Sequence, residues 1–163
     1  IAKERHIIDS AQIIDLINLN RPICTDIGSG SGLPGIVLAI IMKHKKSNMK
    51  FVLYEKSFHK SNFLKEVSKK FNLNVEVLQK DIFEEKNLCS DIIVARAFKP
   101  LPVILDLIHN NFKSFKEVII FLGKNGKEIL GEVMSKWKFE LEQKKSITSN
   151  ESVIIKIKNL EKK

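Results

Sequence analysis

The sequence predicts an α/β fold: a mostly parallel seven-stranded sheet with helices on both faces and an antiparallel pair of strands at the C-terminal end. Short apolar runs alternate along the chain with segments whose apolar residues recur every three or four positions. Strands that alternate with helices are typical of a parallel sheet covered on both faces. The last two runs follow one another without a helical segment, and their alternating pattern favours antiparallel pairing.

We expect strands at residues 23–27, 51–54, 75–78, 91–95, 117–122, 137–141 and 152–158. We expect helices at residues 2–19, 33–44, 57–71 and 128–134, and from Pro100 or Pro102 onward. The first helix rests on a stripe formed by Ile7, Ala11, Ile14 and Ile17. Residues 84–90 are expected to form a polar loop, and no internal repeat or linker interrupts the pattern. The sequence therefore predicts a single domain over residues 1–163.

The most informative stretch is residues 23–35, Ile-Cys-Thr-Asp-Ile-Gly-Ser-Gly-Ser-Gly-Leu-Pro-Gly. A strand ends near Asp26, three alternating glycines follow, and Pro34 opens the next helix at its first position. Glycine lets the backbone reach positive φ and lets a ligand approach the main chain closely. A helix N-terminus adds free N–H groups. The stretch predicts a cradle for a small ligand beyond the carboxyl ends of the strands.

Two classes of ligand fit this cradle. Gly30 to Gly35 matches the G-x-G-x-x-G pattern of dinucleotide-binding proteins, and Glu55 follows 20 residues later at the tip of the second strand. Asp26, two residues before the first glycine, suits a cationic ligand better than a pyrophosphate. S-adenosylmethionine carries an ammonium and a sulfonium and has no phosphate, so the position of Asp26 favours it. Glu55 can accept hydrogen bonds from ribose hydroxyls with either ligand.

The chain is basic, with 28 Lys and Arg against 19 Asp and Glu, a net charge of +9. Such a field favours polyanions such as RNA, although lysines that only solvate the surface would give the same composition. No apolar run approaches the roughly 20 residues of a membrane-spanning helix, and no signal peptide is visible. We therefore expect a cytoplasmic protein. The sequence begins with Ile and not Met, so we expect a piece of a longer chain.

The cysteines and histidines predict neither a disulfide framework nor a metal site. Cys24 lies in the first strand, where a thiol acts as a small apolar side chain, and Cys89 has no partner at a typical spacing. The four histidines show no ligand-like spacing with one another or with the cysteines: His6, His44, His59 and His109. A reduced protein without a bound metal is the expectation.

Further motifs carry a resemblance to a known family. They are Arg5-His6-Ile7-Ile8-Asp9-Ser10, the stretch from Asp26 to Gly35, Lys60 with Phe63-Leu64, and Arg96-Ala97-Phe98. In this order and spacing they resemble the RsmG (GidB) family, bacterial small-subunit rRNA guanine-N7 methyltransferases, over residues 4–130. The resemblance implies a Rossmann-like methyltransferase fold, S-adenosylmethionine as cofactor, and 16S ribosomal RNA or the small ribosomal subunit as partner. It implies the cytoplasm as location and an N-terminal segment that this sequence lacks, and we expect a monomer.

The site residues are expected just beyond the strands. The cofactor-binding candidates are Asp26, Gly28, Gly30, Gly32, Leu33, Glu55, Asp81, Ile82, Phe83 and Arg96. Among them, the resemblance implies cofactor contacts for Gly28, Leu33 and Arg96 and places Ile82-Phe83 at the adenine. The RNA-binding candidates are Arg5, Lys60, Phe98 and Lys124.

Methyl transfer to guanine N7 needs no general base, because N7 has an in-plane lone pair and no proton to lose. Alignment of the reacting atoms is then the main contribution of the protein. Arg96, Lys124 and His6 are therefore positioning candidates, and none is expected to remove a proton. His6 could instead be a packed surface histidine, and Phe98 could stack on the target base or pack internally. Asp9 and Ser10 are expected to bond the backbone at the sheet edge.

Two other functions remain open from the residues alone. An NAD-type dinucleotide-binding oxidoreductase would share the glycine pattern and the sheet class. A non-catalytic RNA-binding module would share the positive charge. Trp137, Phe112 and Phe115 are most simply core residues and favour none of these functions.

Overall fold

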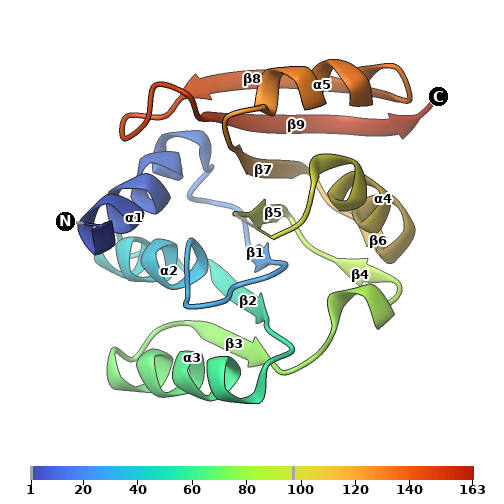
Figure 1. The fold of residues 1–163 in the computed structure, drawn as a ribbon. Helices are drawn as coiled ribbons and strands as arrows, with labels where there is room; N and C mark the ends of the chain where they lie inside the picture. Colours follow the sequence, from blue (N-terminus) through green and yellow to red (C-terminus); the bar gives the residue numbers. More distant parts are fainter. Residues whose placement is uncertain (1, 97) are drawn as a thin grey trace.

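The computed structural model describes residues 2–96 and 98–163, and it confirms the predicted fold class. The main sheet has seven strands in the order β3-β2-β1-β5-β7-β9-β8. The first five are parallel, and β9 pairs antiparallel with both β7 and β8 (Figure 1). The strands of this sheet are β1 (Ile23–Asp26), β2 (Lys50–Tyr54), β3 (Val75–Leu78), β5 (Ile92–Ala95), β7 (Glu117–Leu122), β8 (Trp137–Lys145) and β9 (Val153–Lys162). Ala97, the middle residue of Arg96-Ala97-Phe98, lies outside the described residues.

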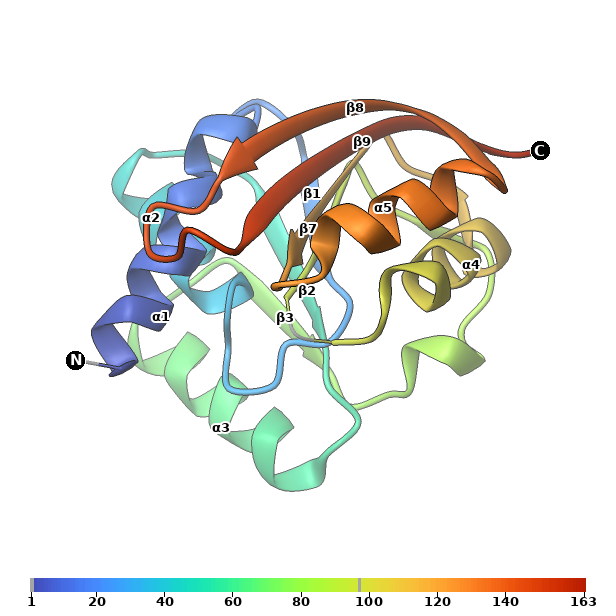
Figure 2. The same cartoon turned by 45° about the horizontal axis from the view of Figure 1, so that its top comes forward.

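Helices cover both faces of the sheet, as the alternation predicted (Figures 1 and 2). One face carries α1 (Ala2–Ala11), the 3₁₀ helix η1 (Gln12–Leu16), α2 (Gly35–His44) and α3 (Phe58–Lys70). The other face carries α4 (Leu101–Asn111) and α5 (Gly126–Met134), with the 3₁₀ helix η2 (Ile82–Glu84) in the loop after β3. Ser57 caps α3 as expected, because its hydroxyl accepts from the backbone N–H of Lys60.

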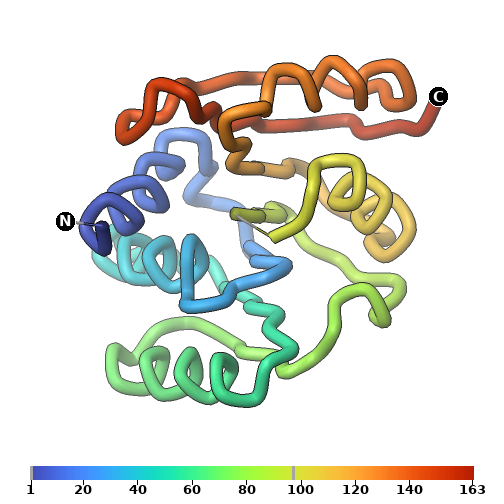
Figure 3. Tube along the Cα trace, viewed as in Figure 1, coloured from blue at the N-terminus to red at the C-terminus, as the bar shows by residue number. Residues whose placement is uncertain are grey.

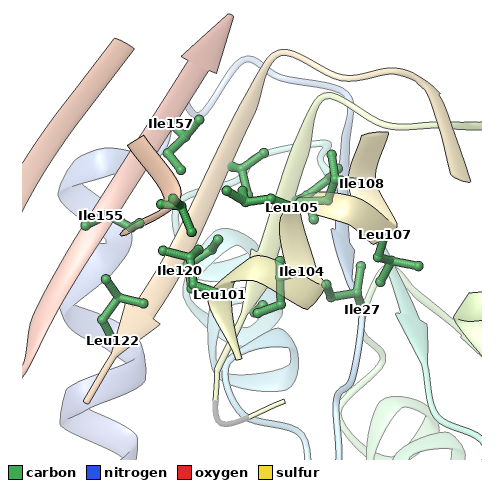
Figure 4. Close-up of a cluster of buried hydrophobic side chains, with 14 of the residues drawn as sticks. Ile27, Leu101, Ile104, Leu105, Leu107, Ile108, Ile120, Leu122, Ile155 and Ile157 are labelled. Atoms are coloured by element: carbon green, nitrogen blue, oxygen red, sulfur yellow. The ribbon is translucent and has the colours of Figure 1, made fainter. Parts of the chain in front are cut away.

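Two apolar cores lie on the two faces because successive strand residues point to opposite sides. In β5, Ile92 and Val94 belong to the core under η1 and α2, whereas Ile93 and Ala95 belong to the core under α4. Figure 4 shows the second core, where α4 side chains meet Ile120 of β7 and Ile155 of β9. Trp137 and Phe112 are buried in this core and Phe115 packs against it, as the sequence predicted.

The N-terminal helix differs from its prediction. The expected single helix over residues 2–19 is an α-helix that continues as η1 and ends at Leu16. Ile7 belongs to the predicted apolar stripe but is 51% exposed, whereas Ile17 is buried. The residues that enter the core come from η1 and its end, so only the second half of the stripe packs on the sheet.

Two further differences concern strands. The expected loop over 84–90 contains β4 (Leu88–Cys89), which pairs with β6 (Phe112–Ser114) in a separate small sheet. Strands of two and three residues are too short to produce a readable period. The final hairpin is longer than expected, and its turn lies beside α1 (Figure 3).

The order of the strands fixes where a ligand can bind. The chain runs outward from β1 through β2 to β3 and then returns to β5 on the other side of β1. In open parallel sheets, ligands bind beyond the carboxyl ends of the strands at such a reversal. Within the described residues, no helix has the length and apolar character needed to cross a membrane.

Candidate functional site

Backbone hydrogen bonds to the two neighbouring strands, β5 and β2, hold the glycine loop after β1. The N–H of Ile27 donates to Val94 of β5, and the N–H of Ser29 donates to Tyr54 at the end of β2. Gly30 and Gly32 have positive φ angles of 53° and 100°, a conformation that side chains with a Cβ rarely adopt. A Cβ at Gly28 would overlap the ring of Phe98. These glycines therefore allow the sharp turn and the close approach of other groups to the main chain.

Asp26 does not face the ligand space as expected. Its side chain is fully buried, and its two oxygens accept from the N–H of Gly28 at 3.3 Å and the N–H of Gly35 at 2.9 Å. Burial raises the pKa of Asp26 to about 7, against the opposing effect of these two backbone donors. Through these two hydrogen bonds, Asp26 joins the two ends of the glycine loop. The peptide between Leu33 and Pro34 is cis, and α2 begins one residue later, at Gly35.

A cleft of about 430 Å³ opens beyond the ends of β1, β2 and β3. Its wall contains most of the candidates, brought together from the four segments that follow β1, β2, β3 and β5 and from the first turn of α3: Gly28, Gly30, Glu55, Lys60, Asp81, Ile82, Phe83 and Phe98. Phe98 stacks on Phe83, with ring centroids 5.9 Å apart and an interplanar angle of 28°. Gly32 is buried inside the glycine loop, and Leu33 is half-buried at the end of that loop. Neither residue lines the cleft.

The cleft wall after β3 is shaped by hydrogen bonds to the backbone. Asp81 caps η2, because its Oδ1 accepts from the N–H of Phe83 at 3.0 Å. Asn111, buried at the end of α4, donates from Nδ2 to the carbonyl oxygens of Ile82, Phe83 and Glu85 at 3.1, 3.1 and 2.7 Å. The Asn111 Oδ1 accepts from Lys86 Nζ at 3.3 Å. Asn111 therefore fixes the segment that presents Ile82 and Phe83 to the cleft.

Arg96 lies outside the cleft wall, in a cluster that joins α1 to the end of β5. Its Nη2 donates to Asp9 Oδ2 at 3.1 Å and to His6 Nδ1 at 2.7 Å. Since a guanidinium only donates, a neutral His6 in this contact carries its proton on Nε2. The group borders a second cavity of about 520 Å³, together with Arg5 and residues of the β8–β9 turn.

Asp9 is the centre of this second cluster. It accepts from the hydroxyls of Thr148 at 2.7 Å and Ser146 at 3.1 Å in addition to Arg96. Burial raises the pKa of Asp9, but the hydrogen bonds and the charge of Arg96 outweigh burial, so the pKa lies below its usual value. The expected bonds to sheet-edge backbone are not what Asp9 makes here: its described partners are side chains. The Ser10 hydroxyl donates within its own helix, to the carbonyl of His6 at 2.9 Å.

Lys124 follows β7 and lies apart from the cleft wall. It is 77% exposed, and its Nζ lies 3.8 Å from Glu151 Oε1 in the turn between β8 and β9. The structure thus divides the candidates between the cleft, the Arg96 cluster and the exposed Lys124.

Several residues of the site were missed by the sequence argument. Tyr54, Lys56, Lys80 and Lys99 line the cleft, and each is adjacent in sequence or nearly so to a residue that was chosen. That adjacency could have identified them. Nothing in the spacing of Asn111 or Thr148 indicated their roles, because both act on segments far away in the chain.

Comparisons with known proteins agree with this geometry. The model of the GidB family, described as rRNA small subunit methyltransferase G, matches residues 2–157. A protein of Pelagibacter ubique named Ribosomal RNA small subunit methyltransferase G is 54% identical over 163 residues, covering all of this chain and 76% of that relative. A protein of the same name from Rickettsia bellii is 36% identical, covering 98% of this chain and 79% of the relative.

Solved structures agree on the fold. M. jannaschii TYW2 in complex with AdoMet superposes with a TM-score of 0.66 and 18% identity, covering 98% of this chain and 77% of that one. M. capricolum TrmK in complex with S-adenosyl-homocysteine has a TM-score of 0.64 and 17% identity, covering 91% and 66%. At such identities the likeness concerns the fold alone.

Proposed function

We propose that this chain, which belongs to the GidB family of small-subunit rRNA methyltransferases, transfers a methyl group from S-adenosylmethionine to N7 of a guanine in 16S rRNA. The observation that carries the proposal is the cleft at the strand reversal, with a glycine edge, one carboxylate after β2 and an apolar wall after β3. Family membership supplies the reaction class. The choice of N7 and of 16S rRNA follows the resemblance and is part of the proposal.

The residues of the cleft fit S-adenosylmethionine. Both Gly28 and Gly30 line the cleft, and the Cβ position of Gly30 is open, so a ligand can lie against the loop there; the Cβ position of Gly28 is filled by the ring of Phe98. The Glu55 carboxylate can accept from two ribose hydroxyls, and Ile82 and Phe83 offer an apolar surface to an adenine. Asp26 acts from beneath by holding the loop, and not by contact with the amino group.

The chemistry requires alignment more than proton transfer. When bound, S-adenosylmethionine supplies a methyl group whose carbon–sulfur bond breaks as N7 donates its lone pair, and the positive charge passes to the purine. No proton leaves N7, so no general base is needed, and Arg96, His6 and Lys124, which lie outside the cleft wall, stay candidates for positioning the RNA. Lys56, Lys60, Lys80 and Lys99 are exposed around the cleft and offer contacts to RNA phosphates.

The test uses small ribosomal subunits, and separately naked 16S rRNA, from bacteria that lack an enzyme of this family. Incubation with the protein and labelled S-adenosylmethionine should add one N7-methylguanine, identified by nuclease digestion and mass spectrometry. The sample that becomes methylated, subunits or naked rRNA, shows whether assembled or free RNA is the substrate. We expect the protein to act in the cytoplasm as a monomer. No new N7-methylguanine in either arm would reject the proposal.

A titration separates the alternatives. Calorimetry should show binding of S-adenosylhomocysteine and none of NADH. Glu55→Gln should weaken that binding, whereas Glu132→Gln, an exposed carboxylate on α5, serves as the matched control. Binding of NADH alone would favour an oxidoreductase, and binding of neither would favour an RNA-binding module.

A further inference from the structure

Helix α3 exposes phenylalanines that its packing does not need. Its inner face is complete: Ser61, Leu64 and Ser68 are buried, and Leu64 is fully enclosed in the core. Phe63 and Phe71 are nevertheless each 50% exposed. Large apolar side chains grouped on a surface are informative because burial is their usual fate.

These rings belong to one stripe that begins at the cleft. Phe63 and Lys70 lie three and ten residues after Lys60, and Phe71, the C-cap, lies eleven residues after it, which is about three turns, so these residues share one flank of the helix and its end. Lys60 lines the cofactor cleft. We call these four residues the α3 stripe. Figure 2 shows α3 along the lower edge of the molecule, where its outer side faces away from the sheet.

The charge of the segment indicates the kind of partner. Residues 56–71 contain five exposed lysines and one glutamate, a net charge of +4. In the stripe the Lys70 ammonium lies 5.9 Å from the centre of the Phe71 ring. Lysines interleaved with exposed rings suit a single-stranded nucleic acid, since lysines contact phosphates and every base can stack on an aromatic ring. An apolar protein partner would not need this excess of positive charge.

We propose that the α3 stripe is the docking surface for a single-stranded stretch of the RNA substrate, leading from the cleft along the helix. The inference rests on the proposed function for the identity of the RNA. Phe63 and Phe71 are separated by about 12 Å along the helix axis. This separation of the rings exceeds the roughly 3.4 Å rise per nucleotide of a stacked strand, so the two rings would stack on bases that are not adjacent.

The opposite flank of α3 provides matched controls. Phe58 is 59% exposed, and Lys65 is exposed about two turns further along, on the flank away from the stripe. Replacing them changes the same residue types on the same helix. All of these side chains lie outside the described core, so folding should be preserved, which thermal unfolding and S-adenosylhomocysteine titration verify.

The experiment measures fluorescence anisotropy of a labelled single-stranded oligoadenylate. Phe63→Ala/Phe71→Ala should weaken binding roughly 10-fold or more, whereas Phe58→Ala should leave it unchanged. Lys70→Gln should reduce the slope of log Kd against log salt by about 0.7, the value for one phosphate contact on a single strand. Equal losses for Phe63→Ala/Phe71→Ala and Phe58→Ala, or no loss for either, would overturn the proposal.

Methylation assays on the same variants separate this inference from the proposed function. If the wild type methylates rRNA and Phe63→Ala/Phe71→Ala does so with an unchanged kcat/KM, the stripe is rejected and the function stands. If the wild type methylates nothing, the function fails and anisotropy alone decides on the stripe. If Phe63→Ala/Phe71→Ala weakens binding to assembled subunits but not to RNA, the stripe contacts a protein. If the wild type self-associates and this variant does not, the stripe contacts a second copy of the chain. Either result overturns the RNA assignment.

Discussion

The cleft beyond β1, β2 and β3 and the Arg96 cluster lie at the ends of neighbouring strands but are built differently. The ends of the glycine loop are joined by bonds of short sequence range, such as the one from Gly35 to Asp26, nine residues apart, whereas the wall after β3 also depends on Asn111, 26 to 29 residues away. The Arg96 cluster joins Asp9 to residues 87, 137 and 139 positions away. A local motif can therefore specify the glycine loop, whereas the Arg96 cluster exists only once the sheet and the final hairpin have formed.

Asp26→Ala should produce the largest effect and should act on the cleft. It leaves the N–H groups of Gly28 and Gly35 without their acceptor, which should lower the free energy of unfolding by about 2–4 kcal/mol. Urea unfolding and S-adenosylhomocysteine titration would measure the loss of stability and of binding. Asp106→Ala, an exposed carboxylate on α4, is the control. An unchanged affinity of Asp26→Ala for S-adenosylhomocysteine would show that the hydrogen bonds of Asp26 do not support the cleft.

The pH dependence of the wild type tests the same group. The folded pKa of Asp26, about 7, lies above its ordinary value of 3.8, so the folded state binds more protons than the unfolded state between these values. The contribution of Asp26 to stability should be full below pH 4 and decline as the pH rises toward 7. Asp26→Asn should remove this decline, and a decline that persists in the variant would assign it to another group.

Asn111→Ala should have the next largest effect, because three carbonyl oxygens of the cleft segment lose their shared donor. We expect a loss of about 1–3 kcal/mol in stability together with weaker S-adenosylhomocysteine binding. Asn110→Ala is a close control, since Asn110 is the exposed neighbour on the same helix. If both variants bind the cofactor alike, Asn111 supports stability only.

Asp9→Asn tests the Arg96 cluster and should lower stability by about 1–2 kcal/mol near neutral pH. Because the folded pKa of Asp9 is lowered, its stabilisation is present above the ordinary value and is lost as the pH falls through the folded value. The free energies of unfolding of the wild type and Asp9→Asn should therefore converge at acidic pH. Asp15→Asn, at an exposed aspartate, is the control. A loss of cofactor affinity as large as that of Asp26→Ala would show that the two regions form one site.

Lys124→Gln should have the smallest effect on stability, below about 0.5 kcal/mol, because its pairing with Glu151 is exposed on both sides. Its value as an RNA contact can then be measured by anisotropy without interference from folding. Lys136→Gln, another exposed lysine, is the control. Equal RNA affinity for both variants would remove Lys124 from the candidates.

The sequence predicted the sheet and most of the cleft because both depend on local patterns. Glycines, short apolar runs and the residue after each strand are readable without a fold. The prediction that Asp26 faces a cationic ligand differs from the structure, in which the carboxylate accepts from two N–H groups of its own loop; its position two residues before a glycine does not determine where the side chain points. Asn111 and Thr148 act across long sequence separations, so no spacing could have indicated them. Ile7 shows the same limit, since periodicity identifies a face but not what covers it.

The position of β9 between β7 and β8 has a consequence for biosynthesis. β7 is almost entirely buried, yet one of its two hydrogen-bonding edges has no partner until β9 has been made. A nascent chain that has emerged only as far as β8 presents an apolar, unpaired strand, which is a template for aggregation. Shielding of β7 during translation should therefore matter more for the yield of this protein than the order in which its helices form.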